Sequence, residues 1–175
     1  SQTACGFVVE FVDIVEERAM NSTGTNVGGW PASEMYTYLN GDFFNKLPED
    51  LRNVIIDTKV ITGHGSTGGE ANFTSTDKLY LLSAHEVLED GTSNQISGRD
   101  TAYNNTRQLD YYNRKGVTTN NYSGAIKLYN SENYYWWLRA AYSSSSSYFL
   151  YVSSSGNWSS NSASTLGVSP AFRIG

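Results

Sequence analysis

A glycine-rich segment, Gly63-His64-Gly65-Ser66-Thr67-Gly68, has the spacing of a dinucleotide-binding loop and follows a predicted strand. In a dinucleotide site such a loop leads into a helix, whose N-terminus holds the pyrophosphate. The residues that follow, 69–74, lack the 3.6-residue period of an amphipathic helix. We therefore predict no dinucleotide here, and no other motif in the chain indicates a cofactor.

His85 and Glu86 resemble the start of a zinc-protease helix. Glu89, however, stands where the second zinc-binding histidine would be. Ser83 and Glu86 instead form the S-x-x-E pattern of a capping box, which predicts that a helix begins at this point. Because the chain has only two His and one Cys, we predict neither a metal site nor a Cys/His nucleophile pair.

General acid–base catalysis needs carboxylates or histidines that converge in a cleft. The available carboxylates have no spacing that singles any of them out, and they include Glu34, Asp42, Asp77 and Asp110. We therefore predict that the protein is not an enzyme.

The C-terminal quarter differs in composition from the rest of the chain. From Asn133 to Gly175 there is no Asp, Glu or Lys, and runs of Ser are interleaved with Tyr, Phe and Trp. A serine-rich tract is often a flexible linker. Here apolar segments at 136–139 and 168–174 enclose the tract, which favours an ordered, loop-rich surface. Tyr, Ser, Gly and Asn also dominate antibody loops, where they give contact area and adaptable hydrogen bonds.

The charge balance argues against nucleic acid as a partner. Twelve Lys and Arg against seventeen Asp and Glu give a net charge of −5, without a basic cluster for phosphates. No apolar run reaches the roughly 18 residues of a membrane span. Because the N-terminus has neither an initiator Met nor a signal peptide, we expect a piece of a longer or processed protein. Cys5 is expected to be a small buried thiol, or to pair with a cysteine upstream.

The pattern of elements places helices early and strands late. Helices are expected at 30–41, 48–55, 83–91 and 107–115, with Gly41 ending the first of them. Strands are expected at 7–15, 60–61, 79–82, 134–138 and 168–174, with Pro170 at a sheet edge or a bulge. This order indicates the α+β class. We predict a single domain over 1–175 with two early helices and a small, mostly antiparallel sheet with long loops.

Three C-terminal segments resemble the ending of a known family: Trp136-Trp137-Leu138-Arg139-Ala140-Ala141, Gly156-Asn157-Trp158 and 167–174. Segments 28–35 and 62–67 resemble earlier parts of that family. The family comprises C-type-lectin-fold domains of gut bacterial surface proteins and phages, and it includes variable proteins of diversity-generating retroelements. The resemblance implies a C-type-lectin-like fold, a receptor-type or adhesin-type function, and an extracellular place on a bacterial cell surface or phage particle.

In such variable proteins a reverse transcriptase rewrites adenines, so that Asn codons yield Ser, Tyr, Ala, Leu, Phe or Asn but never Lys, Glu, Gln, Met or Trp. The tract from Tyr142 to Leu166 contains no Lys, Asp, Glu, Gln or Met. Its one Trp, Trp158, stands at a position that the resemblance makes fixed. This composition is consistent with diversification of the tract.

The chain departs from the calcium-dependent lectins of this fold. No EPN, QPD or WND triplet appears, and no carboxylate follows Glu132. Because calcium needs several oxygen ligands, usually carboxylates, we do not expect calcium-dependent sugar binding. Formylglycine-generating enzymes, which the resemblance places on a related fold, depend on paired cysteines, and Cys5 is the single cysteine here.

We therefore predict a variable ligand-binding region over about residues 140–166 that binds a macromolecule, with protein favoured over glycan. The predicted binding residues, most of them expected to be exposed and adjacent, are Tyr142, Ser144, Ser145, Ser147, Tyr148, Leu150, Tyr151, Ser153, Ser154, Asn157, Ser159, Ser160, Ser162, Ser164 and Leu166. Phe149, Val152, Trp158 and Ala163 are expected to point inward. The core is expected to hold Trp136, Trp137, Leu138, Phe172 and Ile174.

Two alternatives use the same tract differently. In a structural adhesin module the serine-rich face would bind nothing in particular. In a carbohydrate-binding module, Tyr148, Tyr151 and Trp158 would serve as stacking platforms for sugar rings.

Overall fold

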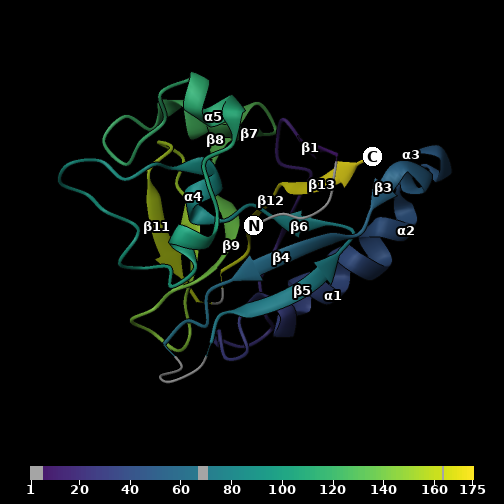
Figure 1. The fold of residues 1–175 in the computed structure, drawn as a ribbon, viewed down its shortest axis with the longest axis horizontal. Helices are drawn as coiled ribbons and strands as arrows, with labels where there is room; N and C mark the ends of the chain where they lie inside the picture. Colours follow the sequence, from purple (N-terminus) through teal and green to yellow (C-terminus); the bar gives the residue numbers. More distant parts are fainter. Residues whose placement is uncertain (1–5, 67–70, 163) are drawn as a thin grey trace.

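The two ends of the chain meet in one sheet. The computed structural model describes residues 6–66, 71–162 and 164–175. Strand β1 (Phe7–Glu10) pairs antiparallel with β13 (Pro170–Ile174), so the first and last strands are neighbours (Figure 1). Two short strands, β3 (Ile55–Ile56) and β6 (Tyr80–Leu81), also pair antiparallel with β13 and complete a four-stranded sheet. Cys5 and Ala163, about which the sequence made predictions, lie outside the described residues.

A five-stranded sheet carries most of the serine-rich tract. Its order is β11 (Trp158–Asn161), β10 (Phe149–Val152), β9 (Trp136–Ala141), β12 (Leu166–Val168) and β2 (Glu16–Arg18). The β9–β12 pair is parallel and the other pairs are antiparallel. The register between β9 and β10 shifts between Phe149 and Tyr151, where a bulge interrupts the pairing. The strands at the two edges are β11 and β2.

Two antiparallel ribbons complete the β structure. One joins β4 (Thr58–Thr62) to β5 (Phe73–Asp77). The other joins β7 (Lys127–Tyr129) to β8 (Glu132–Tyr134) through a tight turn in which Asn130 and Ser131 both have positive φ.

The longest helical segment lies early in the chain. The 3-10 turn η1 (Trp30–Ala32) precedes α1 (Glu34–Tyr38), whose N-cap Ser33 accepts a hydrogen bond from Tyr36 N. The helix continues through the π-helical η2 (Leu39–Phe43) into α2 (Phe44–Lys46), and α3 (Glu49–Val54) follows. The later helices are α4 (Ala84–Val87), η3 (Tyr103–Asn105), α5 (Asp110–Arg114) and η4 (Ser123–Ala125). No helix among the described residues has the length and apolar character of a membrane span.

The predicted fold class is wrong. The protein is mostly β, with 32% strand and 22% helix, and its several sheets include one curled into a half-barrel. An α+β fold with two early helices and one small sheet, including the C-type-lectin-like form expected from the resemblance, does not describe this arrangement. Sequence patterns missed the β content because many strands have only two to four residues, too few for a clear alternation of apolar and polar residues.

Two local predictions also fail, each because a tertiary contact outweighs a local preference. Gly41 does not end the first helix, since Asn40 beside it anchors the helix by accepting hydrogen bonds from Lys78 N and Leu79 N. Pro170 is not at a sheet edge, because β13 lies between β1 and β3. As the first residue of β13, Pro170 occupies a position where the missing N–H is tolerated.

The predicted core is largely confirmed. Trp136, Trp137 and Leu138 are fully buried, and Phe172 is 5% exposed. Ile174, the last residue of β13, is only partly buried and packs against the hydrophobic core. The capping box is also confirmed, since Ser83 Oγ accepts from Glu86 N and the Glu86 carboxylate accepts from Ser83 N.

A buried ion pair connects the capped helix to the five-stranded sheet. Arg139 Nη1 of β9 lies 2.6 Å from Glu86 Oε2 of α4, and both side chains are at most 2% exposed. The same nitrogen donates to Leu81 O of β6 at 2.8 Å, and Arg139 N donates to Leu82 O. One side chain and its backbone therefore hold β9, β6 and α4 together.

We expect Glu86→Gln to destabilise the protein by about 3–5 kcal/mol, because it leaves the buried Arg139 guanidinium without its counter-charge. The matched control is Glu49→Gln on the exposed start of α3, which should change stability by less than about 0.5 kcal/mol. Urea denaturation of the two variants measures the difference. Equal midpoints would show that the ion pair does not hold these elements together.

Candidate ligand-binding surface

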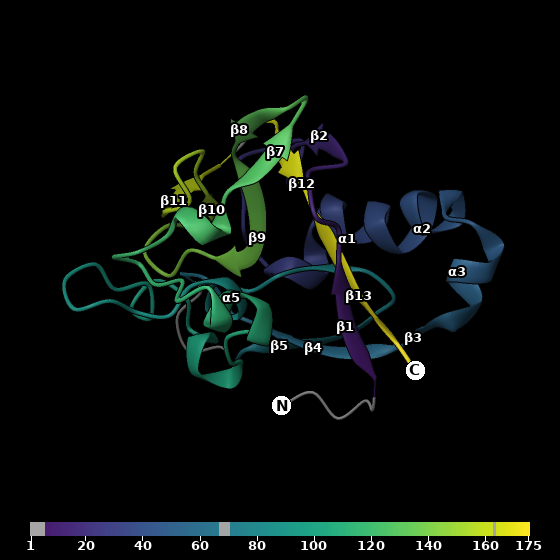
Figure 2. The same cartoon turned by 90° about the horizontal axis from the view of Figure 1, so that it is seen from above.

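The topology divides the serine-rich tract between two ends of the sheet. Because β9, β10 and β11 are antiparallel, the 142–148 connection and the end of β11 lie at one end, while the 153–157 turn lies at the other. Both views place β10 and β11 on the side of the molecule opposite α2 and α3 (Figure 2). A Cβ placed on Gly24 would lie within 4 Å of both Ser147 and Ser162, so these two serines flank the same point.

Residues 142–148, named here the serine loop, are held by their backbone. The buried Asn26 donates from Nδ2 to Ser145 O and Tyr148 O, each at 2.7 Å, and lies 3.3 Å from Tyr142 O. Asn26 N donates to Ser146 O at 2.8 Å. On another side, Ser143 N donates to Arg99 O, and Ser143 Oγ donates to Gly98 O. The contacts with Asn26 and Arg99 reach loop backbone atoms, so they do not depend on the side chains at 144, 146 and 148.

The side chains of the serine loop alternate in exposure. Ser144, Ser146 and Tyr148 are exposed, and Tyr148 is 39% exposed. The rings of Tyr142 and Tyr148 are nearly parallel, with centroids 6.4 Å apart, and the Arg99 guanidinium lies 5.8 Å from the Tyr142 centroid. The loop thus presents small hydroxyls beside an aromatic pair. We name as the loop-end surface six exposed or half-exposed residues of the serine loop together with two residues that follow β11: Tyr142, Ser144, Ser145, Ser146, Ser147, Tyr148, Ser162 and Ser164.

Two predicted binding residues cannot contact a ligand. Leu150 is fully buried and Leu166 is 8% exposed, so the expectation that their side chains are exposed is wrong. Leu150 lies at the register shift between β9 and β10, and Leu166 begins β12, which is enclosed between β9 and β2. The expected inward positions Phe149 and Val152 are fully buried, as predicted, whereas Trp158 is only half-buried.

The remaining predicted residues lie away from the serine loop. Ser153, Ser154 and Asn157 belong to the turn at the far end of the sheet, where Ser153 N donates to Asn157 O at 2.7 Å. Ser159 pairs with Tyr151, and Ser160 pairs with Leu150, so strand alternation turns these two serines to opposite faces. The sixth, Tyr151, packs edge-on against Trp137. All six are half-exposed. The expectation that the whole set is adjacent is therefore wrong.

Sequence reasoning missed Asn26 and Arg99, which shape the serine loop. Asn26 lies more than 110 residues before the carbonyl groups that it contacts. No local pattern marks such a residue. Gly65 weakly indicates the position of Asn26. Its φ is 67°, and a Cβ at this position would crowd the Asn26 side chain, so this glycine is explained without a dinucleotide.

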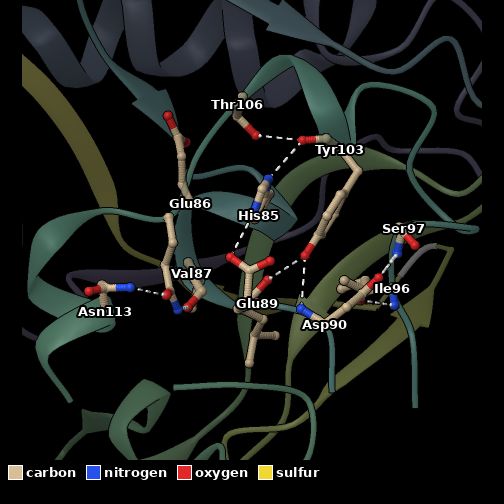
Figure 3. Close-up of polar contacts among 12 residues, drawn as sticks. His85, Glu86, Val87, Glu89, Asp90, Ile96, Ser97, Tyr103, Thr106 and Asn113 are labelled. Atoms are coloured by element: carbon tan, nitrogen blue, oxygen red, sulfur yellow. Dashed lines mark hydrogen bonds and ion pairs between the residues drawn. The ribbon is translucent and has the colours of Figure 1, made fainter. Parts of the chain in front are cut away.

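A second polar cluster surrounds His85 (Figure 3). Its Nε2 lies 2.9 Å from Glu89 Oε2, its Nδ1 lies 3.0 Å from Tyr103 O, and its ring stacks on the Tyr103 ring at 3.9 Å. Burial raises the pKa of Tyr103 well above its usual value, so its hydroxyl stays neutral and accepts from Asp90 N at 2.9 Å. Both imidazole nitrogens therefore lie within hydrogen-bond distance of protein oxygens, which fix the orientation of the ring.

The described residues contain no group of three or more His, Cys, Asp or Glu side chains that could hold a metal ion. The carboxylates considered from the sequence are also dispersed. Asp77 accepts from Trp30 Nε1 at 2.8 Å in the core, and Asp110 begins α5. Glu34 and Asp42 lie on the early helix and line one groove.

Asn26→Leu tests whether this residue holds the serine loop. The substitution keeps the number of side-chain heavy atoms but leaves Ser145 O without its donor, whereas Tyr148 O still accepts from Tyr142 N, so we expect a loss of about 1–3 kcal/mol. Hydrogen exchange of the amides at 143–148 should also accelerate. Ser144→Ala, an exposed change in the same loop, serves as the control and should stay within about 0.5 kcal/mol. Unchanged exchange in Asn26→Leu would refute the anchor.

The buried Asp100 follows Arg99, whose carbonyl group accepts from Ser143 N. Its carboxyl group allows us to predict how the stability of the protein depends on pH. Burial raises the pKa of its carboxyl group above the model-peptide value of 3.8. The folded protein therefore binds a proton on Asp100 at pH values where the unfolded chain has already released it. As the pH rises above 3.8, this difference lowers the stability of the folded state. Asp100→Asn keeps an oxygen acceptor for Ala102 N without the charge.

We expect Asp100→Asn to melt at a higher temperature than the original protein at pH 7, with the difference shrinking toward about pH 4. Thermal melts between these pH values measure the trend. A variant that is less stable throughout would show that the carboxylate is needed in its charged form.

The comparisons with known proteins identify a family. Residues 8–175 match the family described as a domain of unknown function, DUF6273. No curated protein and no solved structure matches the chain. Since the match spans nearly all of its length, this chain belongs to the DUF6273 family.

Proposed function

We propose that this domain is a receptor-type or adhesin-type module that binds a macromolecule, preferably a protein, through the loop-end surface. The observation that carries the proposal is the way Asn26 and Arg99 hold the backbone of the serine loop. A surface whose shape is set by backbone contacts can present different side chains without refolding. Loops on a rigid scaffold are common binding sites for this reason.

The chemistry of the surface supports a protein partner. Tyr142 and Tyr148 offer large, rigid contact area, while the neighbouring serines offer small hydroxyls that both donate and accept hydrogen bonds. Arg99 adds the cation nearest to this pair. Interfaces are enriched in Tyr and Arg, and they are depleted of the Lys, Glu and Asp that this surface lacks.

We further propose that the source gene diversifies this tract, as in the variable proteins of diversity-generating retroelements, on a bacterial surface or phage particle. The support is the restricted alphabet from Tyr142 to Leu166. Buried Leu150 and Leu166 limit such variation to residues that fill the same space. A second copy of the C-terminal codons in the flanking DNA would support diversification, and its absence from the complete locus would oppose it.

A display experiment tests the binding role. One library randomises Ser144, Ser146, Ser147, Tyr148, Ser162 and Ser164. A control library randomises exposed positions on α2 and α3, namely Asn45, Lys46, Glu49, Asp50, Asn53 and Val54. Both libraries are sorted for protease resistance and then selected against the same panel of purified proteins.

We expect most members of both libraries to fold, because exposed positions usually change stability by less than about 0.5 kcal/mol. Specific binders should come from the loop-end library and not from the control. Collapse of the folded fraction in the loop-end library would show that these residues are packing residues. Binding of the original protein to a glycan array, lost in Tyr148→Ala, would favour the carbohydrate alternative.

A further inference from the structure

A groove on the early helix is lined by residues that the proposed recognition surface does not use. It has a volume of about 320 Å³, and its lining residues are Arg18, Glu34, Thr37, Tyr38, Gly41 and Asp42. These come from the edge strand β2 and from the α1–η2 helix, whose continuation α2 lies on the side of the molecule opposite β10 and β11 (Figure 2). Small-ligand sites have volumes of about 300–1,000 Å³, so the groove is large enough for a small molecule.

Gly41 keeps the groove open. It lies inside the π-helical η2, and π-helical turns often occur at functional sites. A Cβ placed on Gly41 would meet no atom within 4 Å, so packing does not require glycine there. Glycine weakens a helix interior, and a larger residue at this position would extend into the space beside the groove.

Arg18 is exposed and stacks on Tyr38, and its guanidinium donates no hydrogen bond to another of the described residues. Its guanidinium carbon lies 3.8 Å from the centroid of the Tyr38 ring. Burial first, and then the nearby Glu16 carboxylate, raise the pKa of Tyr38 to about 12, so the ring stays neutral and the contact persists at ordinary pH. Arg18 forms no ion pair within 4.0 Å among the described residues. A positioned guanidinium of this kind can bind a carboxylate through two parallel hydrogen bonds.

Two carboxylates line the same groove. Ser22 Oγ donates to Glu34 Oε1 at 2.5 Å, and this hydrogen bond lowers the pKa of Glu34, so the group is ionised. Asp42 is exposed and, among the described residues, forms no ion pair. The lining therefore carries two negative charges and one positive charge. A complementary ligand has one carboxylate and two cationic groups.

We propose that this groove binds a basic α-amino acid, with its carboxylate on Arg18 and its two cationic groups near Glu34 and Asp42. Carboxylates alone would attract any cation. The stacked arginine in the same groove selects a molecule that also carries a carboxylate, and the two lining carboxylates disfavour a ligand with a second anionic group. This site is independent of the loop-end surface.

Calorimetric titration with L-arginine and L-lysine tests the ligand class. L-glutamate lacks the second cationic group, and putrescine lacks the carboxylate. We expect arginine and lysine to bind with Kd values of about 1 mM or below, and the two controls to bind at least about tenfold more weakly. No saturable binding of arginine or lysine would overturn the proposal. Putrescine binding as tightly as lysine would also overturn it, because Arg18 would then have no role.

Three variants test the site itself. Gly41→Gln adds a side chain beside the groove and should weaken binding by at least about tenfold while the protein still folds, since a Cβ at this position meets no atom within 4 Å. Arg18→Gln and Asp42→Asn should each weaken binding by about tenfold or more, because each removes a charged hydrogen-bond partner. Glu49→Gln, an exposed carboxylate on α3 outside the groove, is the matched control and should bind normally. Normal binding by Gly41→Gln would show that the amino acid binds elsewhere.

Discussion

The pairing of Arg139 with Glu86 sets the positions of the elements around the serine loop. Arg139 lies in β9, the strand that leads directly into the loop, and Glu86 lies in the capped helix α4. Two charges removed from water lower stability unless further hydrogen bonds satisfy them. Leu81 O accepts a hydrogen bond from the guanidinium, and Ser83 N donates one to the carboxylate. Because these partners come from β6 and the helix N-cap, the pair fixes where β9 ends and hence where the loop begins.

Beyond this starting point, hydrogen bonds to the backbone determine the conformation of the serine loop. Asn26 accounts for three of its carbonyl groups on one side, and the 98–99 segment holds Ser143 on the other. That segment leads through the buried Asp100 to Tyr103, the residue on which His85 stacks (Figure 3). The polar network in Figure 3 is thus connected through this segment to the backbone of the serine loop.

The sequence predicted features that depend on neighbouring residues and missed those that depend on distant ones. The capping box at Ser83 and the buried pair Trp136 and Trp137 were predictable, since a cap spans three residues and an apolar run marks a core strand. The partner of Glu86 was not, because Arg139 lies 53 residues later. Nor was the helix beyond Gly41, which depends on a contact between Asn40 and the turn before β6. Composition singled out the tract as a whole, but only topology separates the serine loop from the 153–157 turn.

Topology also limits how much of the tract can vary. In the strand β10, Leu150 and Val152 face the core, and their partners on β11 are Ser160 and Trp158. Tyr151 lies on the other face against Trp137. A substitution in these strands therefore changes packing on at least one face, whereas Ser144, Ser146 and Tyr148 project from a backbone that other residues hold. Small serines suit such positions because they lose little rotamer entropy when ordered and leave room for larger side chains. Physical tolerance, and not composition alone, is thus the reason that we propose the loop as the binding surface.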